Sequence, residues 1–154
     1  MGAVRARMGC PVDRPYVIFL CSSRTIMPDE VELVNRVAAA LAVRSPHNTP
    51  TLVVRPHPTN AGLWQSYERE GVVVYPKEGD QADTPAAWQS YFDQLAHAAC
   101  VIGLNTTAFL EAVVADRPCL TIVAEEFFRA QGRTGHFRHL LKGGFLDVSA
   151  DVEG

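Results

Sequence analysis

At 154 residues the chain has the length of one ordinary domain, and its 47% hydrophobic and 20% charged content is typical of a soluble globular protein. A formal net charge of −3 and a pI near 5.9 argue against a dedicated nucleic-acid surface, which would show as a basic stripe. No apolar run approaches the roughly 20 residues of a membrane span, and the N-terminus lacks the pattern of a secretory signal. We therefore expect a cytoplasmic protein.

The first half of the chain predicts an N-terminal arm over residues 1–14 and a domain that begins at residue 15. Continuous apolar or β-branched runs indicate strands, and apolar residues four positions apart, at Leu33, Val37 and Leu41, indicate a helix. The expected elements are a strand at 16–21, a helix at 28–44, a strand at 51–55, an amphipathic segment at 63–70, a strand at 72–75 and an acidic loop at 76–83.

The second half predicts further helices and strands in alternation. A cap at Thr84 and a proline at the first helical position begin a helix whose apolar stripe we assign to Trp88, Phe92, Leu95 and Ala99. The remaining expected elements are a strand at 101–104, a helix opened by residues 105–107 and running through Leu110, Val113 and Val114, a strand at 119–123, a helical region at 125–142 interrupted at 132–135, and a strand at 145–148.

Strands that alternate with helices imply right-handed parallel crossovers. The expected fold class is α/β: one doubly wound, Rossmann-like domain over residues 15–150, with a mainly parallel sheet and helices on both faces. Ligands of such sheets bind outside the carboxyl ends of the strands. Besides the stretch from residue 124 onward, the loops at these ends carry the candidate binding residues Ser22, Ser23, Arg24, Arg55, His57, Asn105, Thr106 and Thr107.

The segment Asn105, Thr106, Thr107 lies where a strand gives way to a helix, which places hydroxyl groups and unpaired backbone N–H groups at the positive end of the helix dipole. Glu111 follows Thr107 by four residues and shares its helix face, so a phosphate at the helix start would leave an attached ribose near the carboxylate. The alternative interpretation is simpler: Asn or Thr caps the helix and Glu111 is a solvated helix residue.

His57 lies between two prolines just after a strand, where the flanking rings restrict the backbone and reduce the entropy cost of positioning an imidazole. Such a histidine can donate to a phosphate, and Arg55 adds positive charge nearby. Equally, a histidine in a turn often has no special role, and an arginine at a strand end often forms a surface ion pair.

Other site types find little support in the sequence. There is no GxGxxG after the first strand, no P-loop motif and no GxSxG elbow. His136 and His139 have i, i+3 spacing, but no neighbouring Cys, Asp or Glu completes a ligand set, so we expect neither a metal site nor a cofactor. Trp64, Trp88, Phe127 and Phe128 are interpreted as core or interface residues, with the Phe127–Phe128 pair an alternative pocket lining.

Together, the segments VVRPHP at 53–58, VIGLNTTAFLEA at 101–112 and RPCLT at 117–121 resemble the C-terminal half of B-fold (GT-B) glycosyltransferases, particularly those of capsule and teichoic-acid polysaccharide synthesis. The resemblance covers residues 16–123. It implies that His57 acts on the phosphates of a nucleotide-activated sugar or CDP-glycerol as the catalytic group, that Thr106 and Thr107 bind the phosphates, and that Glu111 lies near the ribose. Threonines here replace the family's more usual serine or glycine pair.

The resemblance also implies that the chain is half of a two-domain enzyme, because that family places its active site between two domains and this sequence lacks the N-terminal acceptor half. Catalysis by the half present would be electrostatic, with His57 and Arg55 stabilising charge on the leaving phosphate. Peripheral membrane association of the full-length protein stays open. The alternatives are a half-domain like that of UDP-N-acetylglucosamine 2-epimerases, or a non-catalytic interaction module whose partner covers the apolar residues near Phe127.

Overall fold

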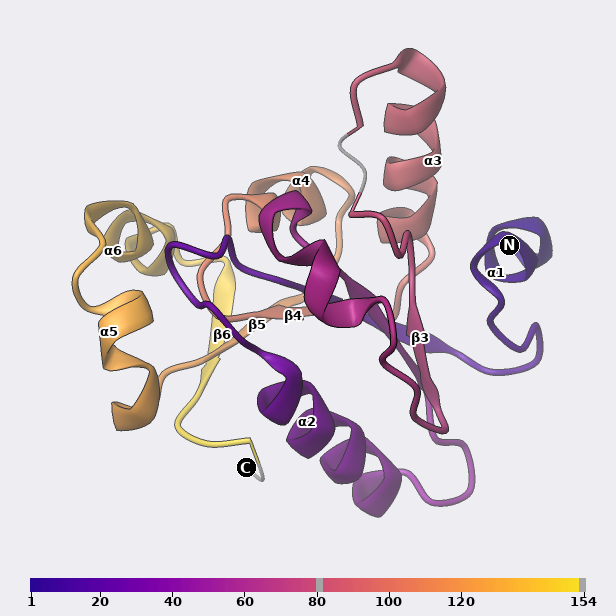
Figure 1. The fold of residues 1–154 in the computed structure, drawn as a ribbon, viewed down its shortest axis with the longest axis horizontal. Helices are drawn as coiled ribbons and strands as arrows, with labels where there is room; N and C mark the ends of the chain where they lie inside the picture. The colour runs from indigo at the N-terminus through magenta and orange to yellow at the C-terminus, as the bar shows by residue number, and fades with distance from the viewer. Residues whose placement is uncertain (80–81, 153–154) are drawn as a thin grey trace.

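The computed structural model describes residues 1–79 and 82–152, and its centre is one six-stranded sheet with the order β3-β2-β1-β4-β5-β6 (Figure 1). Every neighbouring pair is parallel. The strands are β1 Tyr16–Leu20, β2 Thr51–Arg55, β3 Val72–Val74, β4 Val101–Gly103, β5 Cys119–Ile122 and β6 Leu146–Ser149. This is the strand order of the doubly wound Rossmann fold, so the predicted fold class is confirmed.

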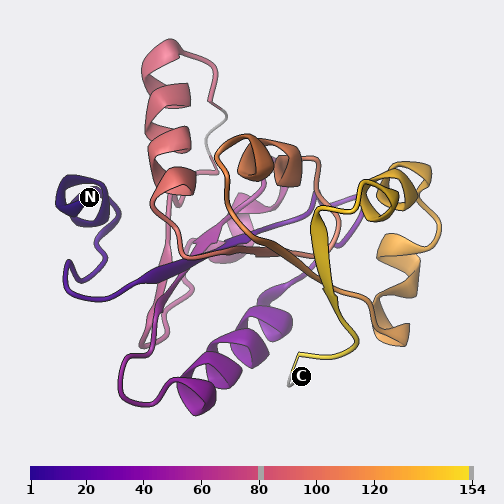
Figure 2. The same ribbon diagram turned by 180° about the vertical axis from the view of Figure 1, so that it is seen from behind.

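The helices lie on both faces of the sheet: α3 and α4 lie on one side and α2 on the other (Figures 1 and 2). Their bounds are α1 Gly2–Met8, α2 Val31–Arg44, α3 Pro85–Ala96, α4 Ala108–Val114, α5 Phe128–Gln131 and α6 Gly135–Lys142, with 3₁₀ turns η1 Pro58–Trp64 and η2 Glu125–Phe127. Among the described residues, no helix is both long and apolar enough to cross a membrane.

Two apolar cores follow from the alternation of side chains along the fully buried strand β1. Ile18 and Leu20 point into the core that contains Leu95 of α3 and Phe109 of α4. Val17 and Phe19 enter the opposite core, which contains residues of α2, η1 and η2: Leu33, Val34, Val37, Trp64 and Phe127. Burial on both faces explains why β1 reads as an unbroken apolar run.

Several predicted details differ from the structure. The amphipathic segment expected at 63–70 is not where the helical turns lie, because they come earlier, in η1. There the His57 side chain accepts a hydrogen bond from the Thr59 backbone N–H, and Pro58 takes the first helical position. On α3 the buried face is Tyr91, Gln94 and Leu95. Trp88, in the predicted stripe, is 42% exposed.

On α4, Phe109 and Ala112 are the buried residues, whereas Leu110, Val113 and Val114 face outward. The residues expected to form an N-terminal arm contain α1, whose Val4 and Met8 join the core beside α3. Of the acidic loop expected at 76–83, residues 80–81 lie outside the described part of the chain.

The loop between β1 and α2 is fastened by a buried carboxyl group. Glu30 is 2% exposed, and its two oxygens accept from the Ser22 backbone N–H at 2.8 Å and the Ser22 hydroxyl at 3.0 Å. Asn60 of η1 holds the same loop by donating from Nδ2 to the carbonyl oxygens of Ser22 and Met27, each at 3.1 Å. Burial raises the pKa of the Glu30 carboxyl to about 7, although the hydrogen bonds from Ser22 act in the opposite direction.

The raised pKa of Glu30 makes stability depend on pH. Between about pH 4.5, the ordinary pKa, and pH 7 the folded protein retains a proton that the unfolded chain has released, so the free energy of unfolding falls as pH rises through this range. The shift corresponds to a loss on the order of 3 kcal/mol. We expect Glu30→Gln, which cannot ionise, to remove most of this loss in urea unfolding at pH 5 and pH 8. Equal losses in wild type and variant would contradict the assignment.

Gly103, the last residue of β4, lies against the backbone of β1. A Cβ atom at this position would lie 3.0 Å from the Leu20 carbonyl oxygen and 3.1 Å from Phe109 Cζ. We expect Gly103→Ala to destabilise the fold by about 1–3 kcal/mol, as overpacking does. Gly62→Ala is the matched control, because its Cβ would have nothing within 4 Å, and it should change stability by less than about 1 kcal/mol. Chemical denaturation of both variants tests the difference.

Candidate functional site

A pocket of about 310 Å³ opens at the carboxyl ends of β1, β2 and β4. Leu20 pairs with Arg55 on one side and Gly103 on the other, so the three strands end in line and their loops meet. This is where the strand order reverses, the usual ligand position in doubly wound sheets. The pocket is lined by Leu20, Cys21, Arg55, Pro56, His57, Pro58, Ala82, Trp88, Tyr91, Thr106, Thr107, Ala108 and Glu111.

A chain of polar contacts crosses the wall of this pocket. The Arg55 guanidinium lies 4.3 Å from the centre of the Tyr91 ring and donates to Gln94 Oε1 at 3.2 Å. The Tyr91 hydroxyl donates to Glu111 Oε2 at 3.3 Å. Burial raises the pKa of Glu111, while the Tyr91 hydrogen bond and the charge of Arg55 lower it. Glu111 is therefore a positioned, half-buried acceptor, not the solvated residue of the simpler interpretation.

His57 is held in one tautomer by Thr59. Its Nδ1 accepts from the Thr59 backbone N–H at 3.2 Å and lies 2.8 Å from the Thr59 hydroxyl oxygen. Because a backbone N–H can only donate, Nδ1 is the unprotonated nitrogen, and the neutral ring carries its proton on Nε2. Burial lowers the pKa of His57, which favours this neutral form at pH 7. His57 is thus set to donate one hydrogen bond from Nε2.

The two threonines at the start of α4 differ in their bonding. Thr106 Oγ1 accepts from the Ala108 backbone N–H at 3.2 Å. Thr107 takes the N-cap position of α4 without a side-chain capping bond, and its side chain is exposed. Its hydroxyl is therefore open to a ligand in the pocket.

Four of the candidate residues lie outside the pocket. The Ser22 hydroxyl is bound to Glu30, and the Ser23 hydroxyl to that of Thr25 at 3.0 Å. Arg24 borders a separate, smaller hollow, of about 270 Å³, beside η1. Asn105 is 2% exposed and turns the other way, where its Nδ2 donates to the carbonyl oxygen of Ala130 and to the hydroxyl of Thr134.

The contribution of α3 to the site was not predicted from the sequence. Tyr91 and Trp88 both line the pocket, yet Tyr91 was left out of the predicted stripe and Trp88 was treated as a core or interface residue. The missed signal is the i, i+3 spacing of these two aromatic residues, which places them on one helix face.

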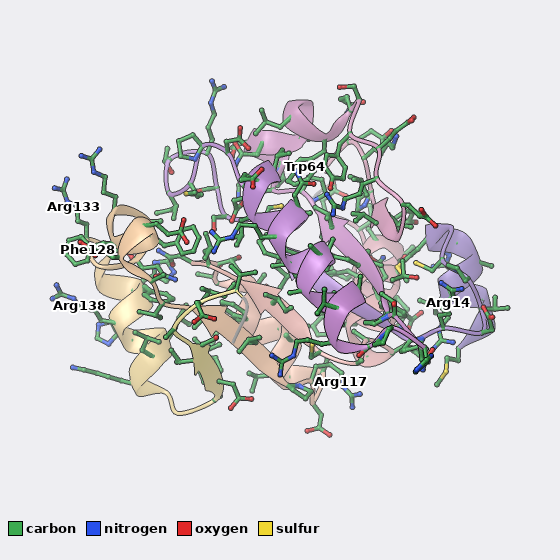
Figure 3. The ribbon with its side chains drawn as sticks, turned by 90° about the horizontal axis from the view of Figure 1, so that it is seen from below. Arg14, Trp64, Arg117, Phe128, Arg133 and Arg138 are labelled. Carbon is green, nitrogen blue, oxygen red and sulfur yellow. The ribbon has the colours of Figure 1, made fainter. Side chains whose placement is uncertain are left out.

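The Phe127–Phe128 pair does not line this pocket. Phe127 is 4% exposed and belongs to the core, so its own side chain offers no surface for a partner to cover. Phe128 is 61% exposed and lies near Arg133 and Arg138 at the outer side of α5 and α6 (Figure 3). Within the described residues, no group of three or more His, Cys, Asp or Glu side chains is arranged to hold a metal ion.

No protein-family model and no curated protein matches the chain. Among solved structures, the UDP-GlcNAc 2-epimerase from Methanocaldococcus jannaschii is similar over 99% of this chain and 40% of its own length, with a TM-score of 0.56 and 11% identity. The KpsC beta Kdo 2,4 transferase of Thermosulfurimonas dismutans covers 71% of this chain and 34% of its own, with a TM-score of 0.46 and 15% identity.

The chain thus spans well under half the length of both solved proteins. At this level of identity the similarity to the epimerase establishes a shared fold: the chain has the Rossmann-like α/β architecture of one part of that protein.

Proposed function

We propose that the chain is the donor-binding half of a GT-B-type enzyme of surface polysaccharide biosynthesis and that its pocket binds a nucleotide-activated sugar or CDP-glycerol. The observation that carries the proposal is the meeting of Arg55, His57, Thr107 and Glu111, from three separate segments, in one pocket at the point where the strand order reverses. The volume, about 310 Å³, lies at the lower end of the range for ligand pockets, about 300–1,000 Å³.

Each group has a role that its surroundings support. Nε2–H of His57 and the hydroxyl of Thr107 donate to phosphate oxygens, and the charge of Arg55 favours an anion. The Glu111 carboxylate accepts from the ribose hydroxyls. In a transfer reaction, negative charge grows on the leaving phosphate as the bond to the sugar breaks, and His57 acts as the catalytic group by stabilising that charge. Because His57 is neutral, its contribution is a directed hydrogen bond rather than a full charge.

An epimerase-like half-domain is the second candidate, and the fold shared with the UDP-GlcNAc 2-epimerase favours it. Both candidates predict the same nucleotide pocket and a second domain that completes the active site. They differ in the ligand: the epimerase candidate requires UDP-GlcNAc as its substrate, whereas the transferase candidate leaves the nucleotide and the transferred group open.

Calorimetric titration of the chain with CMP, CDP, UDP and GDP tests the proposal, because binding of the nucleotide does not need the second domain. We expect one nucleotide to bind, and His57→Ala and Glu111→Ala each to weaken it by about 1 kcal/mol or more, roughly fivefold or more in Kd, through lost hydrogen bonds to charged groups. His47→Ala, at an exposed loop position, is the control and should bind normally.

The absence of binding at millimolar concentration of all four nucleotides would overturn the donor-binding proposal and favour a non-catalytic module. Preference for UDP, followed by tighter binding of UDP-GlcNAc than of other UDP-sugars, would favour the epimerase candidate over the transferase.

A further inference from the structure

Trp88 is a large aromatic residue left partly open to solvent at the wall of the pocket. Its side chain is 42% exposed, whereas Trp64, the other tryptophan, is 1% exposed. Trp88 lines the pocket together with Tyr91, one helical turn further along α3. A ligand that covered the indole ring would remove apolar surface from water, which is favourable.

The indole ring is supported by two neighbours on its own helix. The centre of the Trp88 ring lies 6.1 Å from the centre of the Tyr91 ring and 5.9 Å from that of the Phe92 ring, within the range of aromatic pairs. Tyr91 is in turn fixed between Arg55 and Glu111. Trp88 therefore packs beside Tyr91, whose own position is set by its contacts with Arg55 and Glu111.

The order of the groups along the wall matches the order of the parts of a nucleotide. Thr107 begins α4, Glu111 lies one turn on, the Tyr91 hydroxyl contacts Glu111, and Trp88 contacts Tyr91. In a nucleotide the ribose lies between the phosphate and the base. With phosphate at Thr107 and ribose at Glu111, the base falls on the Trp88 side of the pocket.

We propose that Trp88 is the nucleobase subsite: its ring stacks on the base, so the ligand recognised is a nucleotide and not simply a phosphorylated sugar. This inference rests on the proposed function and extends it to the end of the ligand that the phosphate and ribose contacts do not reach. Stacking tolerates any base because every base has an aromatic face. Trp88 therefore contributes affinity, and discrimination among bases comes from other contacts.

The test compares complete and truncated ligands on matched variants. The ligands are the nucleoside diphosphate that binds best, its nucleotide sugar, ribose 5-phosphate, which lacks the base, and pyrophosphate. The variants are Trp88→Ala, Trp88→Phe, which keeps a ring, and Phe128→Ala, which removes an exposed aromatic residue outside the pocket. Thermal unfolding checks that each variant is folded.

We expect Trp88→Ala to weaken the nucleoside diphosphate by about fivefold to a hundredfold, the range for a lost base–aromatic stack, and Trp88→Phe to weaken it less. Ribose 5-phosphate and pyrophosphate should bind wild type and Trp88→Ala alike. Phe128→Ala should bind all ligands as wild type does. Because Trp64 is buried, quenching of tryptophan emission by the nucleotide should also be lost in Trp88→Phe.

Four results would overturn the inference, and they are distinguishable. Unchanged nucleotide binding by Trp88→Ala rejects the subsite and leaves the proposed function standing. A loss seen with the nucleotide sugar but not with the nucleoside diphosphate places the sugar, not the base, on Trp88. An equal loss for the nucleoside diphosphate and pyrophosphate means that Trp88 only shapes the pocket. If wild type binds no nucleotide, the proposed function and the subsite are rejected together.

Discussion

The pairing of Leu20 with both Arg55 and Gly103 is the constraint on which the candidate site depends. A parallel sheet brings the carboxyl ends of its strands to one edge, and this register brings three of those ends level with one another. Segments that are some 35 to 85 positions apart in the chain then line one pocket. The close approach of Gly103 to β1 is part of the same constraint, since a Cβ atom there would lie 3.0 Å from the Leu20 carbonyl oxygen and would force its neighbours to shift.

Much of the fold could be predicted from the sequence because its signals are local. Strands buried on both faces, such as β1, read as continuous apolar runs, and alternation with helices determines a parallel sheet. Tertiary contacts explain the errors. Helical spacing on α3 fits both the predicted stripe and the Trp88–Tyr91 pair, and the contacts of Tyr91 with Arg55 and Glu111 determine which of the two faces is turned inward. The early turns of η1 depend on a bond from Thr59 to the His57 ring, which propensity does not reveal.

The candidate site was predictable in part, because the position of a residue relative to a strand or helix is a local signal, whereas the direction of its side chain is not. Position at a strand end drew attention to Arg55, His57, Thr106 and Thr107, and helix spacing drew attention to Glu111; these residues line one pocket. Position does not say which way a side chain turns. Ser22 satisfies the requirement of strand-end position but is bound to Glu30, whose burial depends on the packing of the whole loop against η1. A buried acid eight residues away leaves no recognisable pattern around Ser22.

Asn105 and Thr106 show how one turn serves two purposes. Asn105 faces the C-terminal segment and bonds to Ala130, while Thr106, the next residue, faces the pocket. Gln131 strengthens the same attachment, because its Nε2 donates to the carbonyl oxygens of Leu104 at 3.1 Å and Ile122 at 2.7 Å, at the ends of β4 and β5. The loop that presents the threonines is thus anchored from behind by α5. This anchoring holds the turn in place although Thr107 makes no side-chain capping bond. Under the proposed function, a turn that is already ordered reduces the entropy cost of binding an anion there.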